Sequence, residues 1–273
     1  MEQDEEAPAT AVSGPAATLS AIRKQGPLVL AITNYVSMDL TANLLLAAGA
    51  SPMMSRCRDE LGEAVAVAGA LSINIGTATG PDIDFMAEAA RSALDAGRPW
   101  VLDPVGVGAT HFRTEASRRL AGLQPTVIRG NAGEIMALGA GEGGRTRGVD
   151  SSADSSEALD AAQALARSTG SVVAVTGAVD YVTDGRRLHA VANGDPMMTR
   201  VTAVGCALTA LIAAAVAVNE DSVEATAHAL AILGVAGEEA AAQTTGPGSF
   251  RVRLLDLLYG LDAQELAARA TIQ

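Results

Sequence analysis

Short runs rich in β-branched residues alternate along this chain with Ala-rich stretches of helical length, and this alternation constrains the fold more than any other feature. Such an order is typical of consecutive βα units around a buried parallel sheet, and it disfavours a helical bundle or a β-sandwich. We expect strands at residues 28–33, 51–54, 70–74, 100–102, 126–129 and 172–176, and a hairpin that joins 181–183 to 188–191. We expect helices at residues 38–48, 81–96, 114–123, 132–138, 156–169, 205–218, 222–244 and 248–259.

The length and composition suit one domain with a core of small aliphatic side chains. The chain has 273 residues, of which 49% are hydrophobic but only 3% are aromatic, so Ala, Val, Leu and Ile must fill the core. We expect one domain at residues 19–273, preceded by an acidic, mobile leader at residues 1–18, and a Gly-rich surface loop at residues 139–148.

Charge and cysteine content exclude several classes of function. A formal net charge of −12 repels phosphate backbones, so we expect no nucleic-acid partner. No apolar stretch reaches the roughly 20 residues of a membrane span, and the N-terminus lacks the features of a signal peptide, so we expect no membrane segment. The 2 cysteines, Cys57 and Cys206, are too few for a disulfide framework, which favours a reducing cytoplasm.

Polar residues at strand ends are the first candidates for a site, because ligands of α/β sheets bind outside the carboxyl ends of the strands. Asp103 ends one strand run before Pro104, where a carboxylate is able to hold Mg²⁺ or merely to begin a turn. Thr176 ends another run before Gly177, and its hydroxyl is a candidate donor to a phosphate.

A second candidate segment starts at Arg129. The Arg129 guanidinium offers a fork of donors to phosphate oxygens, and a helix start bearing Asn131 and Glu134 follows. Asn131 and Glu134 have the spacing of a capping box, so they suit a nucleotide and metal site, a helix cap, or both.

The third candidate is the start of an apolar helix near Gly205. Unpaired N–H groups at such a start form an anion hole, and the helix field is expected to lower the pKa of the Cys206 thiol. The alternative for Cys206 is a buried structural cysteine. No GxxxxGK[ST] motif is present, so the chain is not a P-loop kinase, and His111, His189 and His228 have no spacing typical of a metal site.

Taken in order, these segments resemble the hydroxyethylthiazole kinase family from about Leu28 to Tyr259. The matching blocks also include Ile32-Thr33-Asn34-Tyr35-Val36, Thr41-Ala42-Asn43, Gly49-Ala50-Ser51-Pro52-Met53-Met54, Asn74-Ile75-Gly76-Thr77, Asp180-Tyr181-Val182-Thr183-Asp184-Gly185 and Gly246-Pro247-Gly248-Ser249-Phe250. The resemblance implies a ribokinase-like three-layer α/β/α fold with a mostly parallel central sheet. It also implies phosphorylation of 4-methyl-5-(2-hydroxyethyl)thiazole in thiamine salvage, with ATP and Mg²⁺, by a homotrimer whose sites lie between subunits.

The resemblance also assigns expected roles to individual residues. It implies that Cys206 and Gly205 are catalytic, with Cys206 where the wider ribokinase-like superfamily has an aspartate base. It implies that ATP is bound by Arg129, Thr176 and Asn131, and that Mg²⁺ and phosphate are contacted by Asp103 and Glu134. It implies that the substrate is bound by Met54, Ala203, Asn34 and Val36. Because phosphoryl transfer passes through a loose transition state, a weak thiol base suffices or is dispensable.

The chain departs from the family pattern in two places. Ala203-Val204-Gly205 stands where the family has Gly-Thr-Gly, and the alanine is tolerable wherever its φ stays negative. The loop Ser55-Arg56-Cys57-Arg58 is more basic than the usual family loop, so it is a candidate to alter the pocket rim or a subunit contact.

Four alternatives remain open at the level of the sequence. They are a kinase of a related small alcohol, a nucleotide-binding homologue weakened by Ala203-Val204, a dehydratase of the same superfamily that acts on hydrated nicotinamide nucleotides, and, least favoured, an NAD-dependent dehydrogenase. The dehydrogenase is disfavoured because no GxGxxG follows the first strand.

Overall fold

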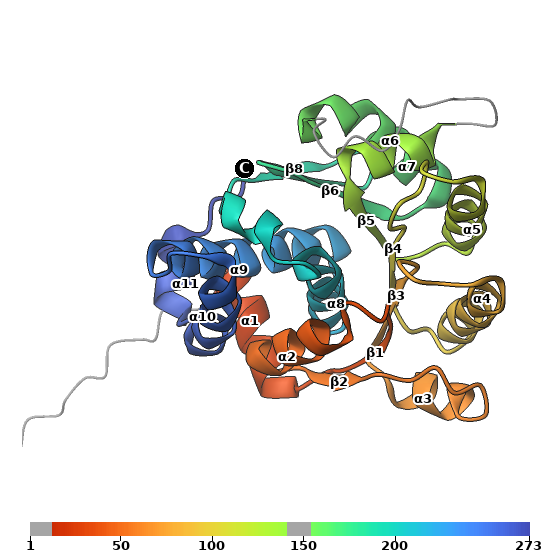
Figure 1. The fold of residues 1–273 in the computed structure, drawn as a ribbon, viewed down its shortest axis with the longest axis horizontal. Helices are drawn as coiled ribbons and strands as arrows, with labels where there is room; N and C mark the ends of the chain where they lie inside the picture. Colours follow the sequence, from red (N-terminus) through yellow and green to blue (C-terminus); the bar gives the residue numbers. More distant parts are fainter. Residues whose placement is uncertain (1–12, 141–153) are drawn as a thin grey trace, which may run out of the picture.

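The computed structural model describes residues 13–140 and 154–273, and it contains the expected mostly parallel sheet (Figure 1). Within the described residues, eight strands form one sheet in the order β2-β1-β3-β4-β5-β6-β7-β8. Neighbours up to β6 pair in parallel, and β7 and β8 continue the sheet in antiparallel pairing. The strands are β1 (Leu28–Ile32), β2 (Ser51–Met53), β3 (Ala70–Asn74), β4 (Trp100–Asp103), β5 (Val127–Asn131), β6 (Val172–Thr176), β7 (Asp180–Thr183) and β8 (Leu188–Val191).

Helices cover both faces of the sheet, which gives the three layers expected (Figure 1). One face carries α1 (Gly14–Gln25), α2 (Met38–Ala48), α8 (Val204–Val216), α9 (Ser222–Ala242), α10 (Pro247–Gly260) and α11 (Ala263–Arg269). The other carries α3 (Leu61–Val67), α4 (Gly80–Asp95), α5 (His111–Ala121), α6 (Ala132–Gly139) and α7 (Leu159–Thr169). Two 3₁₀ turns, η1 (Ser155–Ala158) and η2 (Pro196–Arg200), precede α7 and α8.

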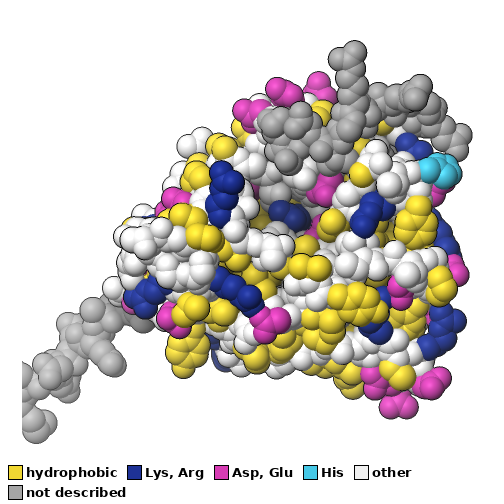
Figure 2. Space-filling model, viewed as in Figure 1, with side chains coloured by type: hydrophobic (Ala, Val, Ile, Leu, Met, Phe, Trp, Pro, Cys, Tyr) yellow, Lys and Arg dark blue, Asp and Glu magenta, His cyan; other side chains and the backbone are white. Residues whose placement is uncertain are grey.

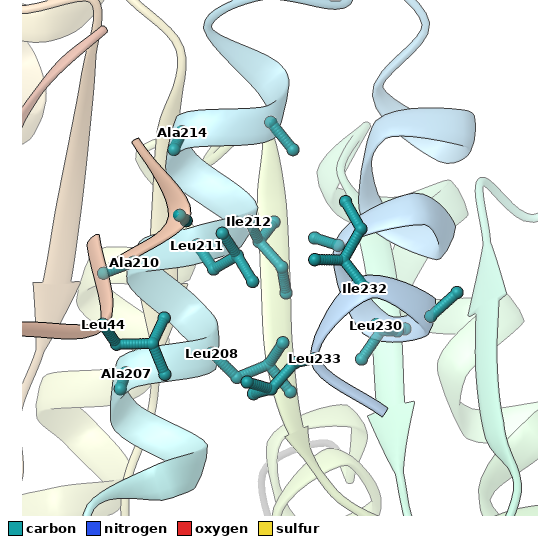
Figure 3. Packing of buried hydrophobic residues seen from close by; sticks show 14 of the residues in the cluster. Leu44, Ala207, Leu208, Ala210, Leu211, Ile212, Ala214, Leu230, Ile232 and Leu233 are labelled. Atoms are coloured by element: carbon teal, nitrogen blue, oxygen red, sulfur yellow. The ribbon is translucent and has the colours of Figure 1, made fainter. Parts of the chain in front are cut away.

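Helix α8 lies in the middle of its layer and is buried along its whole length beyond Cys206. Figure 3 shows it between Leu44 of α2 and the side chains Leu230, Ile232 and Leu233 of α9. Alanines on α8 let these neighbours approach closely, so the small aliphatic core expected from the composition is confirmed. The start of α8 is therefore held in place by packing on several sides.

Local signals in the sequence account for several element ends. Asn131 and Glu134 form the expected capping box of α6, with both reciprocal hydrogen bonds 2.9 Å long. The hairpin between β7 and β8 turns at Gly185, whose φ of +87° suits glycine. Helix α5 begins at His111, three residues earlier than expected, because the Thr110 hydroxyl caps it by accepting from the Arg113 N–H.

Three helices were not expected from the sequence: α1, α3 and α11. The prediction of a leader through residue 18 is wrong for residues 14–18, because they belong to α1, whose Leu19 and Ile22 pack in the core. Residues 1–12 lie outside the described part, and so does most of the expected loop at 139–148, since α6 includes Gly139 and the description stops at Ala140. Among the described helices, none has the length and apolarity needed to cross a bilayer.

Candidate active site

The expected polar residues meet at the carboxyl edge of the parallel strands. β4 ends at Asp103, β5 carries Arg129, and β6 ends at Thr176. The start of α8 lies against the same residues, because the Arg129 guanidinium packs on Gly205. The structure thus brings together residues from four segments that are far apart in the sequence.

The Arg129 guanidinium forms the centre of this group. Its Nη2 donates to the Thr176 hydroxyl over 2.7 Å, and its Nη1 lies 3.9 Å from Oδ2 of Asp103. A Cβ atom on Gly205 would lie only 2.8 Å from Nη1, so the close approach depends on glycine at this position. The side chain of Arg129 remains 13% exposed. On the face seen in Figure 2, a central hollow contains basic side-chain atoms with acidic ones nearby.

Asp103 lies beside the Arg129 guanidinium and is fully buried. Its Oδ2 accepts from the Asn74 carboxamide over 2.6 Å and from the Thr209 hydroxyl over 3.0 Å. Burial raises the pKa of the Asp103 carboxyl to about 7, the positive charge of Arg129 opposes this rise, and the charge of Glu134 adds to it. The other oxygen, Oδ1, is buried and has no hydrogen-bond partner among the described residues. An unsatisfied carboxylate oxygen of this kind points to a further ligand.

A chain of carboxamides links Asp103 to Cys206. Asn74, which donates to Asp103, accepts at Oδ1 from Asn34 over 2.8 Å. The same Asn34 Nδ2 group donates to the Cys206 sulfur over 3.4 Å. Sequence reasoning gave no role to Asn74 or Thr209. Two features of the sequence could have indicated a role for them. Asn74 ends a buried strand, and Thr209 lies one turn after Gly205 on the same helix face.

The expectation that the helix start lowers the pKa of Cys206 is wrong. Burial raises the pKa of the Cys206 thiol, and the nearby Asp103 charge raises it further, although Asn34 and Arg129 oppose both effects. The sulfur is therefore a protonated thiol at neutral pH that accepts a hydrogen bond from Asn34.

The first turn of α8 begins at a strained residue. Ala203 is the N-cap and adopts a left-handed conformation, with φ 72° and ψ 0°, so the condition of a negative φ is not met. Its side chain offers no cap to the helix, and the N–H of Ala207 is the first to bond within it, to the Ala203 carbonyl. The amides of residues 204–206 consequently keep the character of an anion hole.

Asn131 and Glu134 lie at the start of α6 beside this group. Besides its capping bond, Glu134 accepts at Oε1 from the Gly106 N–H over 2.9 Å, which ties the loop after β4 to α6. Each oxygen of the Glu134 carboxylate retains one lone pair for a further ligand. Across residues 13–140 and 154–273, no three His, Cys, Asp or Glu side chains form a metal cage. The carboxylates of Asp103 and Glu134 fit Mg²⁺, which commonly takes one or two protein carboxylates and keeps water and phosphate oxygens as its other ligands.

Three of the expected acceptor-side residues lie on the loops after β1 and β2, toward the β2 edge of the sheet, whereas the fourth, Ala203, is the N-cap of α8. Asn34 is buried and Val36 is 62% exposed, both on the loop after β1, and Met54 is half-buried after β2. In the sheet, β2 and β1 lie on one side of β3 and β4, whereas β5 and β6 lie on the other. Asn34 donates to the Cys206 sulfur and accepts from the Val36 N–H, so the loop after β1 reaches the start of α8.

Comparisons with known proteins point to one family. A family model described as the hydroxyethylthiazole kinase family matches residues 19–264. The chain is 54% identical over 255 residues to a hydroxyethylthiazole kinase of Cereibacter sphaeroides, which covers 93% of this chain and 97% of that protein. It is 52% identical over 259 residues to one of Rhizobium johnstonii, with 94% and 97% covered.

Solved structures give the same answer for the fold. The hydroxyethylthiazole kinase protein from Pyrococcus horikoshii superposes with a TM-score of 0.88 at 43% identity, covering 95% of this chain and 98% of that chain. An ADP complex of Bacillus subtilis pyridoxal kinase superposes with a TM-score of 0.56 at 18% identity, covering 77% and 91%, and this more distant likeness concerns the fold alone.

Proposed function

The chain belongs to the hydroxyethylthiazole kinase family, and on that premise we propose that it transfers the terminal phosphoryl group of ATP to the hydroxyl of 4-methyl-5-(2-hydroxyethyl)thiazole. The family is one of phosphotransferases with a ribokinase-like fold, and this reaction serves thiamine biosynthesis. A dehydratase or dehydrogenase activity is disfavoured, since the family model covers residues 19–264 and the relatives match at about half of all positions.

The observation that carries the proposal is the guanidinium of Arg129 packed on the uncapped start of α8. Arg129 donates to Thr176 and lies so close to Gly205 that a Cβ atom there would displace the guanidinium. A guanidinium group and the free N–H groups of a helix start, when they face the same space, bind phosphate oxygens. We assign Arg129, Thr176 and Asn131 to ATP, and the amides at Gly205 and Cys206 to the phosphoryl group in transfer.

Mg²⁺ is the metal that we propose for this site. Oδ1 of Asp103 and the Glu134 carboxylate are the oxygens that would hold it, directly or through water. When bound, the ion would offset the negative charge of the phosphates. Thr209 and Asn74 keep Asp103 in one orientation, because both donate to its other oxygen.

Cys206 has a modest role in this proposal. Its thiol accepts a hydrogen bond from Asn34, and we assign it to the acceptor hydroxyl. A thiol whose pKa is raised is a weak base, but a loose transition state asks for alignment and charge neutralisation more than for a strong base. Asn34, Val36, Met54 and Ala203 are assigned to the acceptor.

We further propose that the protein works as a homotrimer with its sites between subunits, in a reducing cytoplasm. Tyr35 and Val36 are 65% and 62% exposed on the loop beside the site, which suits burial by a second subunit. Both cysteines are free, which suits a reducing compartment.

An assay with ATP, Mg²⁺ and the thiazole alcohol tests the function. The wild type should release ADP and form the phosphate ester, and Arg129→Gln should lower kcat/KM by about 100-fold, because charged hydrogen bonds contribute roughly 1.5–3 kcal/mol each. Turnover only on another hydroxylated heterocycle would overturn the substrate and keep the fold. Binding of ATP without any transfer would favour a homologue weakened by Ala203-Val204.

A further inference from the structure

The loop after β2 places a partly buried arginine, Arg56, between the segments that follow β1 and β3. Its side chain is 20% exposed, unlike that of Arg58, which is 58% exposed in the same loop. Because the order β2-β1-β3 makes these three strands neighbours, the three segments meet at one end of the site edge. This end carries Asn34, Val36 and Met54, three of the residues assigned above to the acceptor.

Arg56 contacts the residues on both sides of Asn34. Its Nη1 donates to the carbonyl of Thr33 over 3.1 Å, and its guanidinium lies 5.0 Å from the centre of the Tyr35 ring. A cation over an aromatic face is attracted to it, so both contacts hold the loop. Asn34 itself accepts from the N–H groups of Val36 and Ser37, each over 3.0 Å, so its carboxamide follows the backbone of this loop.

The third partner of Arg56 anchors it to a rigid helix. Its Nη2 lies 2.5 Å from Oδ1 of Asp82 in the first turn of α4. The other oxygen of Asp82 accepts from the N–H and hydroxyl of Thr79 over 2.8 and 2.7 Å, which completes the cap of α4. Asp82 thus uses one oxygen for the helix and the other for Arg56.

We propose that Arg56 is a positioning residue for the acceptor alcohol, which fixes Asn34 beside Cys206 by tying the loop after β1 to the start of α4. The inference rests on the proposed function, because it concerns the acceptor side of that site. Arginine suits this role better than lysine, since its planar fork reaches a carbonyl and a carboxylate while it stacks on a ring. This role gives a structural reason for the arginine in the basic loop that departs from the family pattern.

Steady-state kinetics on the wild-type protein and four variants test the proposal. Arg56→Ala should raise KM for the thiazole alcohol about tenfold, the loss expected for one charged hydrogen bond. KM for ATP should stay within about twofold, because Arg129 and Thr176 lie on β5 and β6, which β3 and β4 separate from β1 and β2. Arg56→Lys should restore part of the affinity. Arg58→Ala, which removes the same charge from the same loop, should match the wild type.

Asp82→Asn separates positioning from direct contact with the substrate. Asparagine keeps an oxygen for Thr79 but loses the charge that holds Arg56, so KM for the alcohol should rise about threefold, a fraction of the effect of a lost charged contact. An unchanged KM in this variant beside a raised KM in Arg56→Ala would overturn the positioning role. An equal rise in KM for ATP and for the alcohol would overturn it as well.

Hydrogen exchange provides a readout that does not depend on activity. The amides of residues 33–37 should exchange faster in Arg56→Ala and Asp82→Asn than in the wild type or Arg58→Ala. Unchanged exchange in all variants would refute the positioning role even if the enzyme is an active thiazole kinase. Faster exchange in a protein that shows no transfer to the thiazole alcohol would refute only the proposed function.

Discussion

Replacing Ala203 with glycine should stabilise this protein, although the change removes a side chain. Ala203 is the N-cap of α8 and has φ 72°, a region that favours glycine. Its conformation sets the direction of the free amides at the start of α8. Glycine holds the same backbone without the clash between Cβ and the carbonyl, so the site should keep its shape.

The expected gain is about 1 kcal/mol in the free energy of unfolding. A non-glycine residue in the left-handed region costs about 1–3 kcal/mol, and glycine removes this cost. Glycine also gives the unfolded chain extra entropy, which lowers stability by about 0.4–1 kcal/mol. The methyl of Ala203 is half-buried against the core, so its loss costs about 0.4 kcal/mol, half of the value for a buried methylene.

Thermal and denaturant unfolding measure this difference. A gain of about 1 kcal/mol should raise Tm by about 2–4 °C in a chain of this size. Gln124→Gly is the matched positive control, because Gln124 is the other non-glycine residue with positive φ among the described residues, at 53°. Ala207→Gly is the negative control, because Ala207 is a buried helical residue and its change should lower stability by about 1–2 kcal/mol.

One pattern of results refutes the reasoning. If Gln124→Gly raises Tm and Ala203→Gly does not, then Ala203 stores no backbone strain. Activity is a second check: turnover by Ala203→Gly should stay within about fivefold of the wild type, since a change of about 1 kcal/mol in the transition state corresponds to about fivefold in rate.

Three further predictions follow from the site and the hairpin. Cys206→Ala should lower kcat modestly, by about tenfold or less, and Cys206→Asp should retain or improve it because the Asn34 carboxamide donates to this position; complete loss in both variants would contradict a weak-base role. Gly205→Ala should raise KM for ATP about tenfold without changing KM for the alcohol, since the new methyl displaces Arg129, and equal changes in both constants would argue against the phosphate assignment. Although burial raises it, hydrogen bonds from Arg187 lower the pKa of Asp184 to about 2, below its ordinary value near 4. The Asp184 carboxylate therefore stabilises the fold above pH 4 and loses this effect as the pH falls through about 2; the Tm difference between wild type and Asp184→Asn should shrink over that range, and a constant difference would contradict the sign.

The sequence alone determined the parts of this protein that depend on neighbours along the chain. The alternation of strand and helix patterns predicts β1 to β8 and most helices, because side-chain periodicity is local. The capping box of α6 needs only Asn131 and Glu134 three residues apart. The gathering of Asp103, Arg129 and Thr176 was also predictable, since parallel strands end at a common edge.

Only the tertiary structure decided the electrostatics and the supports of the site. The raised pKa of Cys206 comes from burial and from Asp103, which stands 103 residues earlier in the chain. The positive φ of Ala203 and the contacts of Arg56 likewise depend on segments packed together from distant parts of the sequence. Desolvation, charge at close range and backbone strain depend on distances in space, and a sequence pattern specifies these distances only once the layers have packed.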